Sequence, residues 1–574
     1  MTEAMAQDRR DPGRRNAGMV LAVLMALAAW PWLGTLSLAP VTRDGAMWIA
    51  RGSLAGPDWF RWVFLTSHFN VGYRPLTAFS YTVISAVAGL DPWLYRLTDL
   101  LLHLWVGLSI YLLWRVLARE APRWSGLLAT ALFFAHPLVQ QVVPFIPRRS
   151  YSLAAAMTQA GLLLLLLGIR RHRVQQIFSL RSVLAGLLLA TALLANEAAV
   201  ISALILPLLV FHLVAGMRSP MAMVLRACAL PWGLVVLVLG LRSFMLGGLG
   251  GYAQDPGDGS PMFTALFRGW QDLGSLTGPG GGPAGLAILP VGTLLMLAIA
   301  VYYLYRSLIE PLVGQTSRES KLTLVLAAWT LSYMLLYGAL GVWFPRQSYL
   351  LLIPLSLLLA WIFERTMAVR RFPGTLFLLL PQVLLAIHLL MVSPMVVGPD
   401  PVRTGLWEQR SRRLQAMEQA MAAATVPATV RLVQPYVEAE NRPLRRAGNP
   451  LMGDGGLRRG DAQPAIWMNA IFQARDIQVE EFLYYEEYPG HPGGVPELVA
   501  GADGPLLRLA PDRRHRVATG SHEQYRLLPA GPGQVIPLQP ADLPAVRHLY
   551  LYLQDEDRGG QLVAVPLSRA AEIP

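Results

Sequence analysis

Apolar runs long enough to cross a membrane recur between residues 19 and 395, and they limit the possible folds of this chain more than any other feature. A transmembrane helix needs about 20 mostly apolar residues. Only 15% of the residues are charged, against about 25% in soluble domains. The sequence therefore predicts a polytopic α-helical membrane protein. We place about eleven spans, near 19–36, 97–117, 124–143, 151–169, 181–196, 198–216, 222–245, 284–305, 322–343, 347–367 and 373–395.

Basic residues in the short loops set the expected orientation, because arginine and lysine concentrate on the cytoplasmic side of a membrane protein. If the tail 1–18 is cytoplasmic, the basic segments at 115–123, 170–173, 218–226, 306–321 and 365–371 all fall inside. This agreement requires that 76–90 (TAFSYTVISAVAGL and its preceding leucine) does not cross the membrane. We therefore expect a juxtamembrane helix there, on the outer surface.

The expected transmembrane domain covers 19–396 and carries two large extracytoplasmic loops. The first loop, 39–96, is too polar and too broken by glycine and proline to be one span, yet it is too aromatic for an ordinary solvated loop. The second loop, 247–283, is bracketed by LGGLGGY and GPGGGP. Neither glycine-rich stretch follows a strand and opens a helix, as a nucleotide-binding loop does, so a flexible linker or a lid is expected.

The composition changes from residue 397 onwards. An odd number of spans places this tail on the extracytoplasmic side of the membrane. Residues 407–424 have a helical pattern, and short alternating runs predict strands. These runs are ATVRLVQPYV, IQVEEFLYYEEY, PLLRLA, YRLLPA, HLYLYLQ and QLVAVPL. We expect 397–574 to form a small α+β domain.

Composition also excludes some classes of function. Cys228 is the single cysteine, so neither an intrachain disulfide nor a thiolate metal cluster can form. The net charge of +12 comes almost entirely from arginine, but no nucleic-acid-binding motif is present, and no nucleic-acid partner is expected. Membrane lipids are the expected surroundings.

Several arginines fall in outer loops or at outer span ends, against the orientation rule. They are Arg43, Arg61, Arg74, Arg148, Arg149, Arg242 and Arg346. Guanidinium groups match phosphate oxygens well. Together these residues indicate an anionic ligand at the outer face, with ordinary surface arginines as the alternative for each of them.

Five motifs in the transmembrane region appear in an order that resembles a known family. They are YRPLTAFSY, GLDPWLYRLTDLLLHLWVGLSIYLLWRVL, ALFFAHPLVQQVVPFIPRRSYSLAA, NEAAV at 196–200 and RQSYLLLIP at 346–354. This order is similar to that of GT-C fold membrane glycosyltransferases, in the branch of the transmembrane and tetratricopeptide-repeat protein O-mannosyltransferases and their bacterial relatives. The chain departs from the family at Tyr151 and Asn196, among other positions, and its tail lacks tetratricopeptide repeats.

The resemblance implies a polyprenyl-phosphate-linked sugar donor that is used at the extracytoplasmic face. The acceptor would be a hydroxyl of a protein, a glycan or a lipid. Together with the composition, the family branch suggests a bacterial inner membrane with a periplasmic C-terminal domain. No side-chain spacing specifies a metal site, and since some GT-C enzymes use a divalent ion, a metal cofactor stays open.

Sugar transfer to a hydroxyl needs a base for the acceptor proton and positive charge for the departing phosphate. Asp44 is the acidic residue early in the first loop. It matches an acidic motif of the family, so we predict it as the base, with a helix-capping or surface aspartate as the alternative. Arg74 precedes Pro75, which suits the first turn of a helix, so a phosphate there would meet both a guanidinium and a helix N-terminus.

Further candidates complete the predicted site. Arg148, Arg149, Arg242 and Arg346 are candidates for the same phosphate, and Tyr73, His68, His136, Glu197 and Tyr349 are candidate substrate contacts. Glu197 is expected in a tight hairpin between two spans. For His136, which precedes Pro137, shaping a helix end is the stronger expectation.

Two other classes of function stay open. A transporter or flippase for a lipid-linked anionic substrate would commonly show internal repeats, and we find none that is convincing. A noncatalytic membrane scaffold would not need several outward arginines.

Overall fold

The computed structural model describes most of the transmembrane region and the strands that follow it. The described residues are 12–38, 43–54, 56–68, 72–170, 179–217, 219–248, 318–339, 345–368, 393–397, scattered positions between 408 and 422, and the C-terminal strands. The spans predicted at 284–305 and 373–395, most of the loop 247–283 and most of the helix predicted at 407–424 lie outside them. The chain divides into two units, of which the first comprises Met1–Leu36, Pro57–Ile84 and Trp93–Asp400.

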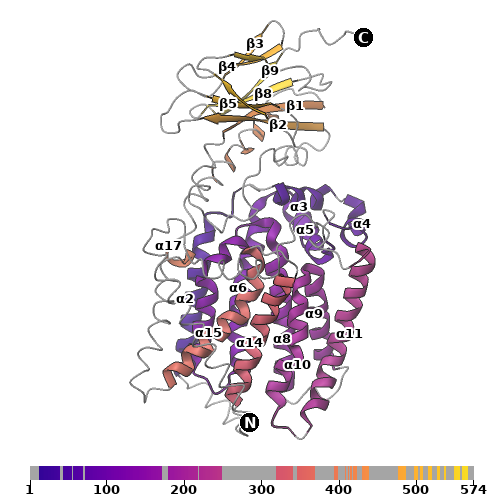
Figure 1. Ribbon diagram of the computed structural model, residues 1–574, viewed down its shortest axis with the longest axis vertical. Helices are drawn as coiled ribbons and strands as arrows, with labels where there is room; N and C mark the ends of the chain where they lie inside the picture. The colour runs from indigo at the N-terminus through magenta and orange to yellow at the C-terminus, as the bar shows by residue number, and fades with distance from the viewer. Residues whose placement is uncertain are drawn as a thin grey trace. The chain divides into compact units, whose positions relative to one another are not determined.

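The first unit is built of helices (Figure 1). They are α2 (Pro12–Leu33), α4 (Trp59–Phe64), α5 (Pro75–Ala88), α6 (Pro92–Leu117), α7 (Arg123–Ala135), α8 (Arg149–Arg170), α9 (Leu180–Ala195), α10 (Val200–Val214), α11 (Pro220–Leu246), α14 (Arg318–Ala339), α15 (Ser348–Ala368) and α17 (Pro394–Val397). Short 3-10 turns join several of them, at Gly56–Asp58, Pro137–Gln141, Ile146–Arg148, Glu197–Ala199 and Pro345–Gln347. Packing runs from α8 to α9, from α9 and α10 to α11, from α10 to α14, from α14 to α15 and from α15 to α7.

Seven helices in the described part are long and apolar enough to cross a membrane. They lie at Asn16–Leu33, Pro92–Leu117, Ile146–Arg170, Glu197–Val214, Pro220–Leu246, Lys321–Ala339 and Ser348–Met367. The lengths and the apolar composition of these helices show that the chain is an integral membrane protein. α5 is a helix of 14 residues, as predicted for the first outer loop. The span predicted at 181–196 is the 16-residue helix α9.

The span predicted at 124–143 is wrong in its second half. α7 has 13 residues and ends at Ala135, and His136 takes extended backbone angles (φ −67°, ψ 127°). The reason is local, because the ring of Pro137 disfavours helical angles at the residue before it. His136 then caps the next turn, since its side chain accepts the N–H of Leu138. This is the helix-end role expected for His136.

Contacts between helix termini show that α6, α8 and α10 end at the same end of the bundle. At one end of the bundle, Arg170 at the end of α8 donates to the carbonyl of Arg115 near the end of α6, at 3.0 Å. His212 in the last turn of α10 hydrogen-bonds the carbonyl of Leu117 at 3.1 Å. The basic residues of the α6–α7 connection lie at this end, which we call the basic end.

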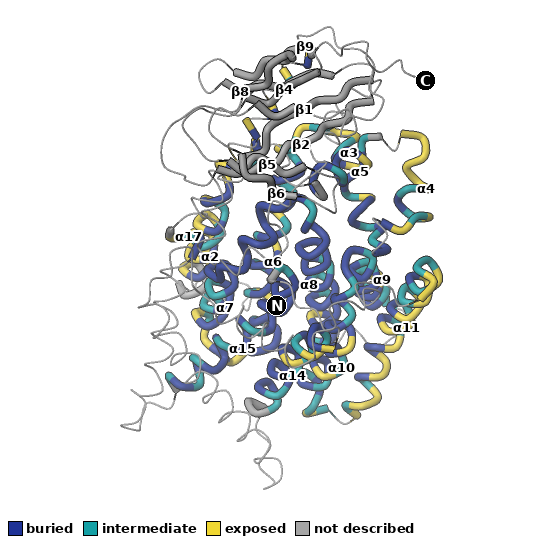
Figure 2. The backbone as a smooth tube through the Cα atoms, turned by 45° about the horizontal axis from the view of Figure 1, so that its top comes forward, coloured by how far each residue is buried: buried dark blue, intermediate teal, exposed yellow. Residues whose placement is uncertain are grey.

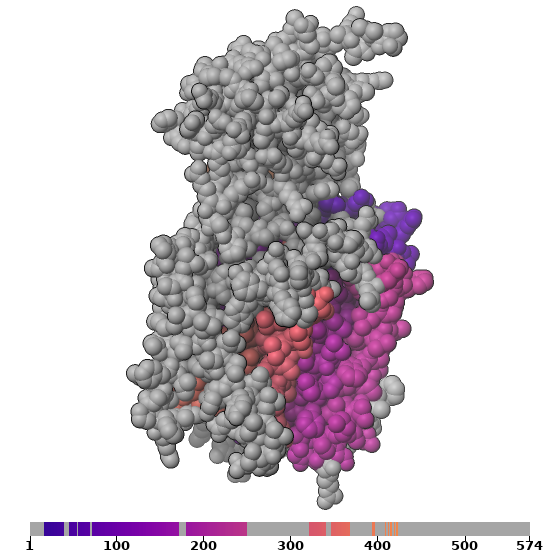
Figure 3. Space-filling model, in the orientation of Figure 1, coloured from indigo at the N-terminus to yellow at the C-terminus, as the bar shows by residue number. Residues whose placement is uncertain are grey.

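The interior and the outer surface of the bundle differ as a membrane requires. Figure 2 shows α8 buried along most of its length, whereas α11 is exposed on one side. Exposed apolar side chains of α11 include Leu225, Val236, Leu237 and Phe244, and Figure 3 shows this surface in magenta. Such a face is what a helix in contact with lipid presents.

The second unit comprises Ser37–Gly56, Ser85–Pro92 and Pro401–Pro574. It contains α3 (Arg43–Leu54) and the strands β1 (Thr429–Val437), β2 (Asp476–Glu486), β3 (Glu497–Gly501), β4 (Gly504–Arg508), β5 (His515–Thr519), β6 (Arg526–Ala530), β7 (Val535–Pro537), β8 (Leu549–Asp555) and β9 (Gly559–Val565). One sheet has the order β6-β5-β2-β1-β8-β9 and the other β3-β4-β7. β1 is parallel to both of its neighbours, with Thr429 opposite Asp476. Each apolar run that was predicted as a strand contains one.

Candidate functional site

A short loop before α5 sets the position of Arg74. His68 and Gly72 pair as an isolated antiparallel bridge, with the N–H of His68 donating to the carbonyl of Gly72 at 2.7 Å. The N–H of Arg74 donates to His68 Nδ1 at 3.2 Å, and Nε2 of the same ring hydrogen-bonds the carbonyl of Trp62 at 3.2 Å. Only the neutral tautomer with its proton on Nε2 can make both bonds. His68 is therefore a positioning residue for the Arg74 backbone.

The ring of His68 is kept neutral by its surroundings. Burial, with a smaller contribution from the charge of Arg74, lowers its pKa to about 4, although the hydrogen bond to Trp62 opposes the shift. A base for proton abstraction near neutral pH needs a pKa close to 7. The geometry and the pKa both favour a structural role over general base chemistry at His68.

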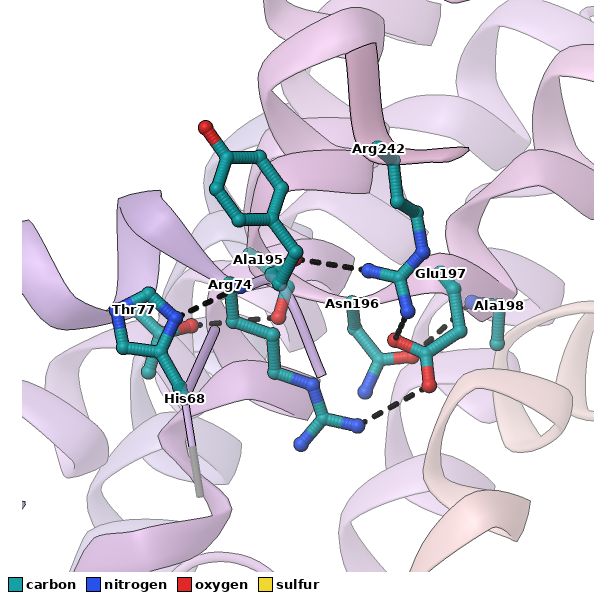
Figure 4. A network of polar contacts seen from close by, with 9 residues as sticks. His68, Arg74, Thr77, Ala195, Asn196, Glu197, Ala198 and Arg242 are labelled. Atoms are coloured by element: carbon teal, nitrogen blue, oxygen red, sulfur yellow. Dashed lines mark hydrogen bonds and ion pairs between the residues drawn. The ribbon is translucent and has the colours of Figure 1, made fainter. Parts of the chain in front are cut away.

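The side chains of Arg74, Glu197 and Arg242 point towards one another (Figure 4). They lie at the end of the bundle opposite the basic end, because α10 begins beside Glu197 and ends at the basic end. Arg74 Nη2 donates to Glu197 Oε1 at 3.1 Å, and Arg242 Nη2 lies 3.5 Å from Glu197 Oε2. Arg242 Nη1 also donates to the carbonyl of Tyr73 at 2.8 Å. We call these three side chains the arginine pair and its carboxylate. They come from the start of α5, the turn after α9 and the last turns of α11.

The turn between α9 and α10 is built to present Glu197. α9 ends at Ala195, and Asn196 is extended (φ −155°, ψ 130°) with its Oδ1 accepting the N–H of Ala198. The hydroxyl of Thr77 in α5 donates to the carbonyl of Ala195 at 3.3 Å. These bonds connect the start of α5 to the turn, and they confirm the tight hairpin expected at Glu197.

The arginine pair and its carboxylate carry two positive charges and one negative charge. The side chains are 15% exposed at Arg74, 33% at Glu197 and 5% at Arg242, so the group is open to one side. One surplus positive charge at a partly exposed position can hold an anion, because guanidinium groups bind phosphate oxygens strongly. The sequence analysis named all three residues as candidates, and the structure brings them together.

Arg149 lies in a second cluster, inside the helical unit. Its Nε donates to Asp99 Oδ1 at 2.6 Å, and its Nη2 donates to the carbonyl of Tyr95 at 2.6 Å. Its guanidinium carbon stands 4.4 Å from the centre of the Tyr81 ring. The exposed side-chain fractions are 0% for Arg149 and 2% for Asp99. Arg149, a predicted phosphate contact, therefore donates to Asp99 and Tyr95 inside the protein. Asp99 was not predicted as a partner.

The remaining predicted residues lie elsewhere in the helical unit. Arg148 is buried and donates to the carbonyl and to Oε1 of Gln141, the latter at 2.8 Å. Tyr349 is fully buried, and its hydroxyl hydrogen-bonds His103 Nδ1 at 2.9 Å. Arg346 lies in the turn Pro345–Gln347 that opens α15. The printed partners of Arg148 and Tyr349 are thus other groups than the arginine pair and its carboxylate.

Asp44 belongs to the second unit and is the second residue of α3. Its side chain lies outside the described part of the structure. Among the described residues, no group of three or more His, Cys, Asp or Glu could hold a metal ion. The role of Asp44 and the divalent ion stay predictions.

The buried neutral state of His68 predicts a loss of stability in acid. The unfolded chain has the ordinary pKa of 6.5 and the folded chain a pKa of about 4, so between these values the unfolded state binds more protons. Stability should fall as the pH drops from about 6.5 to about 4, by up to roughly 3 kcal/mol. Thermal unfolding in detergent at several pH values, for the parent and for His68→Gln, measures this. Other titrating groups affect the parent and the variant alike. If Tm depends on pH in the same way in both proteins, His68 does not cause the loss of stability.

Comparisons with known proteins give only distant matches. No family model matches this chain, and no curated protein matches it. Among solved structures, the oligosaccharyltransferase AglB from Archaeoglobus fulgidus matches with a TM-score of 0.42 and 12% identity, over 82% of this chain and 69% of that chain. ArnT from Cupriavidus metallidurans, bound to undecaprenyl phosphate, matches with a TM-score of 0.38 and 14% identity, over 81% of this chain and 93% of that chain.

Proposed function

We propose that this chain is a membrane glycosyltransferase of the GT-C type. It transfers a sugar from a polyprenyl-phosphate-linked donor to a hydroxyl of a protein, glycan or lipid acceptor. The observation that carries the proposal is the convergence of Arg74 and Arg242 on Glu197, at 3.1 and 3.5 Å, in a partly exposed position at one end of a membrane helix bundle. A phosphate that enters there finds positive charge already in place.

The chemistry assigns a separate task to each group. The acceptor oxygen forms a bond to the anomeric carbon of the sugar while the bond from that carbon to the phosphate oxygen breaks. The phosphate leaves with the electron pair, and Arg74 and Arg242 stabilise the charge that develops on it, as preorganised donors do. The acceptor gives its proton to a base, and Asp44 is the base that we propose.

The distribution of basic residues supports an extracytoplasmic location for the arginine pair. Arg115 lies in the last turn of α6, Arg119 follows that helix and Arg123 begins α7. Arg170 ends α8 at the same end of the bundle. Cytoplasmic ends of spans are enriched in such residues. With the basic end inside the cell, the arginine pair faces the periplasm or its equivalent. A bacterial inner membrane with a periplasmic C-terminal domain is part of this proposal.

Removal of either arginine should slow transfer strongly. Loss of one preorganised group that stabilises developing charge costs about 10²–10³ in rate, so Arg74→Ala and Arg242→Ala should each lose activity on this scale. The measurement is transfer of label from a panel of radiolabelled polyprenyl-phosphate sugars to a membrane extract by the purified full chain. Arg226→Ala is the matched control, since Arg226 is an exposed arginine on α11, the same helix as Arg242.

The panel also separates this function from its alternatives. Label transferred by the parent and not by the two variants would support the proposal and identify the donor. Donor binding without transfer to any acceptor in the extract would favour the flippase. A folded parent that neither binds nor transfers would leave the scaffold as the better account.

A further inference from the structure

The turn after α9 contains a buried amide to which the proposed phosphate contacts assign no role. Asn196 is 2% exposed. Its Oδ1 accepts the N–H of Ala198 at 3.1 Å, which identifies the oxygen end of the amide, because an NH2 group cannot accept that bond. The Nδ2 group therefore points away from the turn. Among the described residues, it has no hydrogen-bond partner.

A buried donor without an acceptor is unfavourable and calls for an explanation. Figure 4 shows the Asn196 amide on the same side as the Glu197 carboxylate, with its nitrogen directed towards the Arg74 guanidinium. The nearby carboxylate is already held by Arg74 and Arg242, at 3.1 and 3.5 Å. Donors of Asn196 and Arg74 thus converge, and an anion with several oxygens would accept from both.

We propose that the side-chain NH2 of Asn196 donates a hydrogen bond to an oxygen of the phosphate held by Arg74 and Arg242. This inference rests on the proposed function and adds a ligand-contacting residue to it. The amide supplies a donor without a charge, so the surplus at the site stays at one positive charge. That surplus matches the single negative charge of a phosphodiester, the form in which a sugar is linked to its carrier. The monoester that remains after transfer carries more negative charge, about −1.5 to −2, and is matched less well.

Phosphate binding to the purified full chain tests this directly, without sugar transfer. A ligand that binds only the folded state raises its stability according to its concentration and Kd. The probes are undecaprenyl phosphate, inorganic phosphate and undecaprenol, and the readout is Tm in detergent. Two variants are compared with the parent. Asn196→Ser keeps an oxygen that can cap the turn but loses the NH2 group, and Asn196→Asp also adds a negative charge.

Undecaprenyl phosphate should stabilise the parent, and undecaprenol should not. The apparent Kd should rise about tenfold or more in Asn196→Ser, and further in Asn196→Asp. Asn16→Asp makes the same chemical change at an exposed position near the start of α2 and should bind as the parent does. Stabilisation by inorganic phosphate as well would show that the phosphate group alone is recognised, whereas its absence would assign recognition to the lipid-linked form. Either result supports the proposal if the binding of the phosphate that stabilises the parent is weaker in the Asn196 variants.

Three outcomes would overturn the inference: no stabilisation of the parent by either phosphate, equal stabilisation by undecaprenol, or unchanged binding in both Asn196 variants. The Tm without ligand shows whether each variant folds, and Asn196→Ser alone suffices if Asn196→Asp does not. Asn196-dependent phosphate binding in a chain that transfers no sugar would refute the glycosyltransferase proposal only. Sugar transfer with unchanged phosphate binding in both variants would refute the role of Asn196 only.

Discussion

An Asp44→Asn variant is expected to transfer sugar about 10²–10⁴ times more slowly than the parent, which is the usual contribution of a general base. Asparagine has nearly the same shape as aspartate but cannot take a proton from the acceptor. Asp44 is also the second residue of α3, where loss of a negative charge near the helix N-terminus costs only about 0.3–1 kcal/mol. The substitution should therefore leave the chain folded and able to bind the donor, and remove the chemical step.

Single-turnover transfer with a saturating donor measures this step separately from binding. Asp58→Asn is the matched control, because Asp58 is an exposed aspartate in the turn Gly56–Asp58 of the same predicted loop. It should transfer at the parent's rate. If Asp44→Asn also retains the parent's rate, Asp44 is not the base and its capping role is the better explanation.

The largest effect on stability should come from Asp99. Asp99→Leu would leave the Arg149 guanidinium, which is fully buried, without its charge partner at 2.6 Å. Breaking a buried ion pair by removing one partner costs about 3–5 kcal/mol. Chemical or thermal unfolding in detergent should show a loss of this size. Transfer assays are not needed, because the expected change is in the free energy of unfolding.

The double variant Asp99→Leu with Arg149→Met is the decisive comparison. Replacing a buried ion pair by apolar residues of similar volume is often neutral or stabilising, so the double variant should recover most of the stability that Asp99→Leu loses. Equal losses in the single and double variants would show that packing around Tyr81 and Tyr95, and not the uncompensated charge, accounts for the effect. A single variant as stable as the parent would contradict the pairing itself.

The local features of the helical unit could be predicted where each depends on neighbouring residues. The helix at Pro75–Ala88 follows from its apolar pattern and from Pro75 at its start, and proline favours that position. Pro137 likewise predicts the helix end at His136, where α7 stops. The span predicted at 124–143 is wrong because it extends past this proline.

The partners of the arginines could not be predicted in the same way. Arg149 and Arg242 look alike in the sequence, as arginines at the outer end of an apolar run. In the structure, Arg149 is paired with Asp99, which lies 50 residues earlier, whereas Arg242 shares Glu197 with Arg74, which lies 123 residues before that carboxylate. Which arginine stays open to a ligand depends on these partners. The partners are set by the helices that lie side by side.

The sequence by itself determined that this chain enters a membrane, roughly where its helices lie and which ends carry the basic residues. Each of these follows from the transfer of one segment from water to lipid, and that free energy depends on the composition of the segment alone. The tertiary structure decided which charged side chains meet. The start of α5, the turn after α9 and the end of α11 had to come to one place before Arg74, Glu197 and Arg242 could form a group. A contact between side chains so distant in the chain depends on helix packing, which no local pattern specifies.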